Sequence, residues 1–142
     1  MVAKKSGGGV DDDRAKSLYV EYRSLSEQFK KAQEFLEELA ENIAEVTGLI
    51  KSLEELRGLE GGSRILAPIA NGVFVTARLE ETGTVRMNVG GGVVVEKSVP
   101  AAQKLLEEQR GELRKNRERV SKEAFAMMLR LKEIESLVER EG

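Results

Sequence analysis

Three consecutive glycines form the segment of this sequence whose residue types best suit ligand chemistry. They lie in MNVGGGVVVEKS, residues 87–98, ahead of a polar end that carries Lys97 and Ser98. A phosphate-binding loop uses such glycines to bring backbone amides to a helix N-terminus, where the helix dipole also attracts the anion. In that loop the glycines lead directly into the helix, with a lysine and a hydroxyl just after them.

The residues after the glycines argue against a nucleotide site. Val93, Val94 and Val95 predict a strand, and no glycine turn precedes the Lys-Ser pair. We therefore predict that Gly90 to Gly92 form a tight turn between two strands and hold no nucleotide.

Other catalytic chemistry is poorly provided for. The 142 residues include no Cys and no His, which excludes disulfides, zinc–thiolate sites, thiol nucleophiles and the commonest general base. Most acidic residues alternate with Lys and Arg in helical stretches, as on solvated faces. We expect no enzyme, no metal site and no cofactor.

Charge and hydropathy limit the partners. The formal net charge of -2 gives no overall attraction to nucleic acid. No segment approaches the roughly 20 apolar residues of a membrane span, and the N-terminus lacks an apolar signal core. We expect a cytoplasmic protein that binds neither nucleic acid nor a membrane.

The first long pattern in the sequence is helical. Residues 1–10 are Gly-rich and predict a flexible tail, and Asp11 to Asp13 suit a helix N-terminus. The helix is predicted over 11–58. Its apolar residues recur in alternating steps of four and three, as in a coiled-coil seam: Leu18, Tyr22, Leu25, Phe29, Ala32, Leu36, Leu39, Ile43, Val46, Ile50 and Leu53.

Residues 64–97 predict two β-hairpins. Four short β-rich runs are separated by Asn71-Gly72, by a turn at 81–83 and by the glycines. The Asn-Gly pair favours a type I′ turn, whose two central residues both need positive φ. Pro68 cannot donate to a strand ladder, so its strand is predicted to lie at an edge or carry a bulge.

A second helix is predicted over 98–140, with Ser98 as N-cap and Pro100 in its first turn. One seam column is Leu106, Leu113, Val120, Met127 and Ile134, and the other is Arg110, Arg117, Ala124, Leu131 and Val138. The fold class is therefore α+β: a long antiparallel coiled-coil hairpin with two β-hairpins inserted, forming a single unit over 11–142.

The hairpins predict oligomerisation. A lone hairpin is marginally stable and its edges invite pairing, so we expect strands of other subunits to complete an intersubunit β-barrel. A self-contained cap on the helix ends is the alternative. The residues expected to make the subunit contacts are Ile65, Ile69, Val73, Val75, Leu79, Val85, Met87, Val89, Val93 and Val95.

The central block resembles that of prefoldin α-type subunits. The resemblance rests on RILAPIANGVFVTARLEETGTVRMNVGGGVVVEKS between two coiled-coil helices, and it spans about residues 11–140. It implies a co-chaperone hexamer of two α and four β subunits, whose coiled-coil tips capture unfolded polypeptides without ATP for a group II chaperonin.

The resemblance places client contacts at the free ends of the two helices. The residues expected there, named the tip surface below, are Leu18, Tyr19, Val20, Tyr22, Leu25, Met128, Leu131 and Leu137. Tyr19, Val20 and Met128 are favoured because they lie off the best seam.

Two other functions are considered. A scaffold or tether would space folded partners and ignore unfolded chains. Nucleic-acid binding would use the cations of the second helix, but acidic residues alternate with them and no aromatic platform accompanies them. These cations are Arg110, Arg114, Lys115, Arg117, Arg119 and Lys122.

Overall fold

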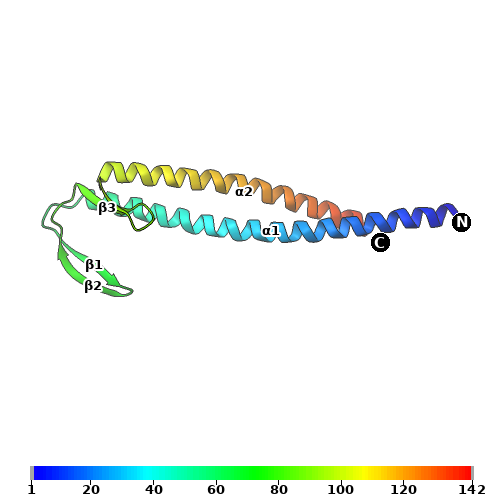
Figure 1. Cartoon of the computed structure of the whole chain (residues 1–142), viewed down its shortest axis with the longest axis horizontal. Coiled ribbons are helices and arrows are strands. Elements are labelled where there is room, and N and C mark those ends of the chain that lie inside the picture. The colour runs from blue at the N-terminus through cyan, green and yellow to red at the C-terminus, as the bar shows by residue number, and fades with distance from the viewer. Residues whose placement is uncertain (1, 142) are drawn as a thin grey trace. The chain divides into compact units, whose positions relative to one another are not determined.

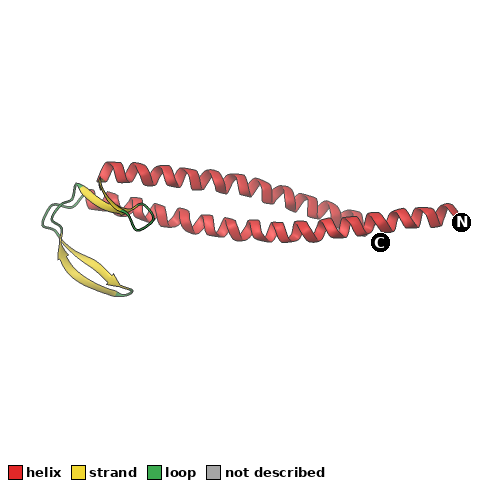
Figure 2. Cartoon of the chain, in the orientation of Figure 1, coloured by secondary structure: helices red, strands yellow, loops and turns green. Residues whose placement is uncertain are grey.

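The computed structural model describes residues 2–141 and has six elements (Figures 1 and 2). They are α1 (Val2–Arg57), β1 (Arg64–Ala70), β2 (Val73–Arg78), β3 (Thr84–Asn88), β4 (Val94–Ser98) and α2 (Val99–Glu141). Two long helices with two antiparallel hairpins between them confirm the predicted fold class. No helix within residues 2–141 is long and apolar enough to cross a membrane.

The chain divides into two compact units, and both helices contribute to each of them. The first unit combines α1 up to Glu41 with α2 from Arg114, and the second covers Asn42–Leu113 with both hairpins. Within each unit, the chain runs in opposite directions along the two helices (Figure 1). The prediction of one single unit from residue 11 onward stays a prediction.

The start of α1 differs from the sequence prediction. The helix begins at Val2, so residues 2–10 continue it and Asp11 to Asp13 do not lie at its N-terminus. Extending an existing helix adds one hydrogen bond for each ordered residue, which opposes the cost of about 1 kcal/mol for each helical glycine. The flexibility of this segment stays a prediction.

The predicted seam of α1 is the buried stripe of the helix. Each of its eleven predicted positions is buried or partly buried in the structure. Leu39 and Ile50 are the most enclosed, with 3% and 4% of their surface exposed. The steps of four and three thus identified the face of α1 that packs against α2.

The seam of α2 follows the first predicted column closely and the second only in part. Ile134 is 1% exposed, and Ala124 is buried as well. Arg117 is exposed, in line with the polar start of the second column, but Val138 is 48% exposed. The second column is therefore covered at Ala124 and Leu131 and open to solvent at Val138.

The first turn of α2 adds buried residues that the predicted seam omitted. Val99 and Ala102 are 1% and 0% exposed. They precede Leu106 in steps of three and four, so the seam begins directly at the hairpin. Ser98 Oγ accepts a hydrogen bond from the Ala101 amide at 3.2 Å, which confirms the predicted N-cap.

The first hairpin pairs β1 with β2. Its turn at Asn71-Gly72 was predicted correctly in place but not in type, since Gly72 has a φ of 78° and Asn71 does not have a positive φ. The register shifts between Pro68 and Ala70, which confirms the predicted bulge. An extra residue on one strand lets a turn with a single left-handed glycine close the hairpin.

The second hairpin pairs β3 with β4 and closes through the three glycines. Gly90, Gly91 and Gly92 have φ values of 111°, 60° and 77°. The Val93 amide donates to the Gly90 carbonyl at 3.1 Å, so Gly91 and Gly92 are the two central residues of this turn. Positive φ at both central positions is what a type I′ turn requires, and glycine meets it without strain.

Candidate functional site

The glycine loop lacks the geometry of a phosphate-binding loop. It leads into β4, and α2 begins only at Val99, after that strand has ended. The Asn88 side chain accepts a hydrogen bond from the Gly90 amide at 3.0 Å, so this amide already has a partner. The glycines act as a turn, as their place between two strand-like runs predicted.

The predicted tip surface lies in the first unit and varies widely in exposure. Tyr19 and Val20 are each 65% exposed, whereas Leu18 is only 8% exposed. The remaining members are partly buried: Tyr22, Leu25, Met128, Leu131 and Leu137. Of the three favoured residues, Tyr19 and Val20 are therefore open to solvent, and Met128 is partly covered.

An apolar groove of about 290 Å³ lies beside the exposed tyrosine. Its apolar lining comes from Tyr19 and Tyr22 of α1 with Ile134 and Val138 of α2. Because Val138 is 48% exposed, the second seam column opens to solvent at this groove. The groove thus presents apolar surface from both helices to solvent.

Polar contacts join the two helices around this groove. The Tyr22 hydroxyl donates to Glu135 Oε1 at 2.7 Å. This hydrogen bond to a carboxylate raises the pKa of Tyr22 above its ordinary value of 10.0. Neutral Tyr22 therefore holds Glu135 at the edge of the groove.

A salt bridge lies next to this hydrogen bond. Arg130 reaches from α2 to Glu21 of α1, and the same guanidinium pairs with Glu133 one turn along its own helix at 3.1 Å. The hydrogen bond from Arg130 lowers the pKa of the Glu21 carboxyl below its ordinary value of 4.5. The pKa of Arg130 is raised, first by its hydrogen bond to Glu21.

Half of the hairpin residues predicted to contact other subunits are exposed in the single chain, and the other half are partly buried. Ile69, Val73, Val75, Val89 and Val93 are between 43% and 65% exposed. The other members are partly buried: Ile65, Leu79, Val85, Met87 and Val95. Exposure on this scale leaves the hairpins with apolar surface that a single chain does not bury.

Comparison with known proteins decides the family. The model of the family Prefoldin, described as prefoldin subunit, matches residues 25–141.

The chain belongs to the prefoldin family.

Two archaeal relatives show which prefoldin subunit it resembles. Prefoldin subunit alpha of Thermofilum pendens is 31% identical over 121 residues, covering 85% of this chain and 94% of the relative. Prefoldin subunit alpha of Methanococcoides burtonii is 28% identical over 129 residues, covering 91% and 94%. The predicted resemblance to α-type prefoldin subunits is thus confirmed.

A solved structure agrees with the fold. A chain in the cryo-EM structure of filamentous PFD from Methanocaldococcus jannaschii superposes with a TM-score of 0.71 and 21% identity. The match covers 86% of this chain and 98% of that one. Prefoldin subunits are co-chaperones and not enzymes, so family membership confirms the prediction of a non-enzymatic chaperone protein.

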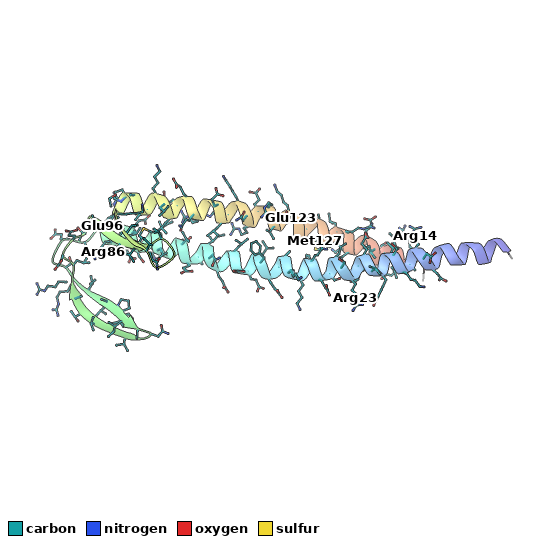
Figure 3. All side chains as sticks on the ribbon, viewed as in Figure 1. Arg14, Arg23, Arg86, Glu96, Glu123 and Met127 are labelled. Atoms are coloured by element: carbon teal, nitrogen blue, oxygen red, sulfur yellow. The ribbon has the colours of Figure 1, made fainter. Side chains whose placement is uncertain are left out.

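The basic stretch of α2 is a salt-bridged helix face. Arg119 pairs with Glu123 at 3.4 Å, and Lys122 pairs with Glu118 at 3.3 Å, each across one helical turn. Figure 3 shows Glu123 on α2, four residues before Met127. These pairs neutralise part of the stretch considered for nucleic acid.

Over the described residues, no cluster of acidic side chains suited to a metal ion is found.

Sequence reasoning missed two exposed apolar residues on the first hairpin. Leu66 and Phe74 are 68% and 56% exposed, and neither was among the predicted contact residues. They alternate with the predicted residues along β1 and β2, so they belong to the opposite face of the hairpin. The sequence already showed this second apolar surface, because Leu66 and Phe74 stand on the face of the hairpin that was expected to be polar.

Proposed function

We propose that this chain is the α-type subunit of a co-chaperone that captures unfolded polypeptides at the tip surface, without ATP, and delivers them to a group II chaperonin. The observation that carries the proposal is the exposure of Tyr19 and Val20, each 65% open to solvent, with Tyr19 lining an apolar groove. Two neighbouring exposed apolar residues, one of which lines a groove, offer a surface on which parts of a client chain can be buried.

The proposed mechanism uses weak contacts. Unfolded chains expose apolar side chains in no fixed order, so a suitable surface must adapt to many shapes. Met128 is partly exposed near this end of α2, and its unbranched thioether side chain suits such adaptation. Several such surfaces gripping one chain raise the effective local concentration, so feeble single contacts still give useful avidity. Release then needs only competition by the chaperonin.

The hairpins supply the proposed assembly. Each hairpin is a two-stranded sheet with exposed apolar residues, and such a sheet gains stability when further strands cover it. We infer that hairpins of prefoldin β-type subunits complete a barrel with these strands, in an arrangement of two α and four β subunits. The complex would work in the cytoplasm, where newly made chains need a chaperonin.

The proposal is tested by recovering the tagged full-length chain from its native cell extract and measuring the masses of its bound partners. A smaller coiled-coil subunit in twofold excess, with a chaperonin following it, is the expected result. Suppression of aggregation of a denatured protein by the recovered complex is the second readout. A single folded partner at unit stoichiometry, without any effect on aggregation, would favour the scaffold function instead.

A further inference from the structure

The first hairpin carries apolar residues on both of its faces, and only one face is needed for the proposed barrel. One face carries the predicted contact residues, such as Val75, together with Ala67. The opposite face, named the second face here, holds six residues that pair directly across the strands: Arg64 with Arg78, Leu66 with Thr76, and Pro68 with Phe74. All six are exposed.

The second hairpin provides an internal comparison. Its corresponding face is polar, with Thr84 opposite Ser98 and Arg86 opposite Glu96. Figure 3 shows Arg86 and Glu96 on this hairpin. Asn88 completes it opposite a single apolar residue, Val94. This is the ordinary pattern of a hairpin with one face in water, and the second face of the first hairpin departs from it.

The two arginines of the second face indicate which kind of ligand it can bind. Arg64 and Arg78 lie directly opposite each other, and like charges in that position destabilise a hairpin. Among the described residues, neither guanidinium has a side-chain hydrogen bond or ion pair. Two adjacent guanidiniums form a site for a carboxylate, since each offers a planar fork of donors that matches carboxylate oxygens.

The apolar part of the second face lies toward the turn, beyond these cations. Leu66 and Phe74 are 68% and 56% exposed, and Pro68 stands directly opposite Phe74. The ligand must therefore combine apolar side chains with carboxylates at one end. A second copy of the same face offers no carboxylate, because its six residues include none.

We propose that the second face binds an acidic, extended segment of a partner protein, with apolar side chains on Leu66, Pro68 and Phe74 and a carboxylate between Arg64 and Arg78. This contact is separate from client capture at the tip surface. The proposal rests on the proposed function in one respect: it assumes that the opposite face of the hairpin is used by the barrel.

The test uses the full-length chain assembled with its natural partners. The probe is a fluorescent synthetic peptide in which leucine and threonine alternate before a terminal run of aspartates, and a matched peptide ends in lysines. Fluorescence anisotropy should show binding of the aspartate peptide only, and added salt should weaken it. Arg64→Gln with Arg78→Gln should weaken binding about tenfold or more, as for loss of a charge-assisted hydrogen bond.

The apolar half and the control are tested in the same assay. Leu66→Thr with Phe74→Thr keeps residues that favour strands and should also weaken binding about tenfold. Val94→Thr, on the corresponding face of the second hairpin, should leave binding unchanged. Equal binding of both peptides, or unchanged binding in the variants, would overturn the proposal.

The mass of the complex shows whether the second face binds a separate partner or belongs to the interface between subunits. Leu66→Thr with Phe74→Thr should leave that mass and the suppression of aggregation as in the wild type. A lower mass would place the second face inside the subunit interface and would overturn the inference, while the co-chaperone function would stand. If the wild-type complex does not suppress aggregation at all, that result would instead count against the proposed function alone.

Discussion

Arg130 and Glu21 form a two-pronged salt bridge between the helices of the first unit. Arg130 Nε donates to Glu21 Oε1 at 3.0 Å and Nη2 donates to Oε2 at 2.9 Å. This fork fixes both the distance and the rotation of one helix against the other, because both bonds must be aligned at once. Glu21 directly precedes Tyr22, which lines the apolar groove together with Tyr19 and Val138.

Glu21→Gln should lower the melting temperature at neutral pH, and the loss should shrink in acid. Arg130 lowers the pKa of Glu21, so the stabilisation is present above the ordinary pKa of 4.5 and is lost as pH falls through the lowered value. Melting curves of both proteins from pH 7 downward measure the difference. The exposed Glu27→Gln is the control, and a gap that is the same at every pH would contradict the prediction.

Tyr22→Phe should show the opposite dependence on pH. The pKa of Tyr22 is raised above 10.0, so its hydrogen bond to Glu135 contributes fully below pH 10.0 and is lost as pH rises through the raised value. The stability difference between wild type and variant should therefore persist from neutral pH to pH 10.0 and decline in stronger alkali. In the Tyr19→Phe variant, Tyr22 is the one tyrosine left in the chain, so an NMR titration with isotope-labelled tyrosine follows its hydroxyl alone. Ionisation of Tyr22 at or below pH 10.0 would refute its hydrogen bond to Glu135.

Ile134→Ala should destabilise the coiled coil by about 2–5 kcal/mol, the usual cost of removing a buried large aliphatic side chain. Ile134 is 1% exposed, whereas Leu129 on the same helix is 51% exposed. Leu129→Ala is the matched control and should change stability by less than about 0.5 kcal/mol. Denaturant unfolding measures both. If Ile134→Ala fails to fold, Ile134→Val should cost about 0.5–1.5 kcal/mol.

Two glycine substitutions should have opposite effects. Gly48 lies inside α1 with open space where a Cβ would stand, so Gly48→Ala should stabilise the protein by about 1 kcal/mol. Gly91 has a φ of 60°, so Gly91→Ala should cost about 1–2 kcal/mol. Thermal unfolding of both variants provides the comparison. A Gly91→Ala variant as stable as the wild type would mean that the turn does not need a left-handed backbone, and a less stable Gly48→Ala variant would contradict the helix argument.

Tyr19→Ser with Met128→Ser should weaken aggregation suppression and leave the mass of the assembled complex unchanged. Tyr19 is 65% exposed and Met128 is partly buried, so both can change without emptying the seam. Light scattering of a denatured protein diluted into the complex measures the activity. Ser52→Ala, on the exposed part of α1 in the second unit, is the control. Unchanged suppression would remove these two residues from the client site.

The pattern of apolar residues by itself predicts the buried faces of the helices, the strands and the glycine turn. Steps of four and three place Leu39 and Ile50 on one face of α1, and the polypeptide geometry allows few other arrangements of such a pattern. The valines after the glycines likewise decided that Gly90 to Gly92 join two strands. Local chemistry was sufficient for these predictions because each depends on neighbours along the chain.

Other features depend on residues that are distant in the sequence, and only the tertiary structure decided them. The pairing of Glu21 with Arg130 requires the register of one helix against the other, which a seam alone does not specify. Side-chain exposure has the same origin, since Leu18 is buried and Val138 is open although both continue a regular apolar pattern. Periodicity states which face of a helix is apolar, and packing between the helices decides how much of that face is covered.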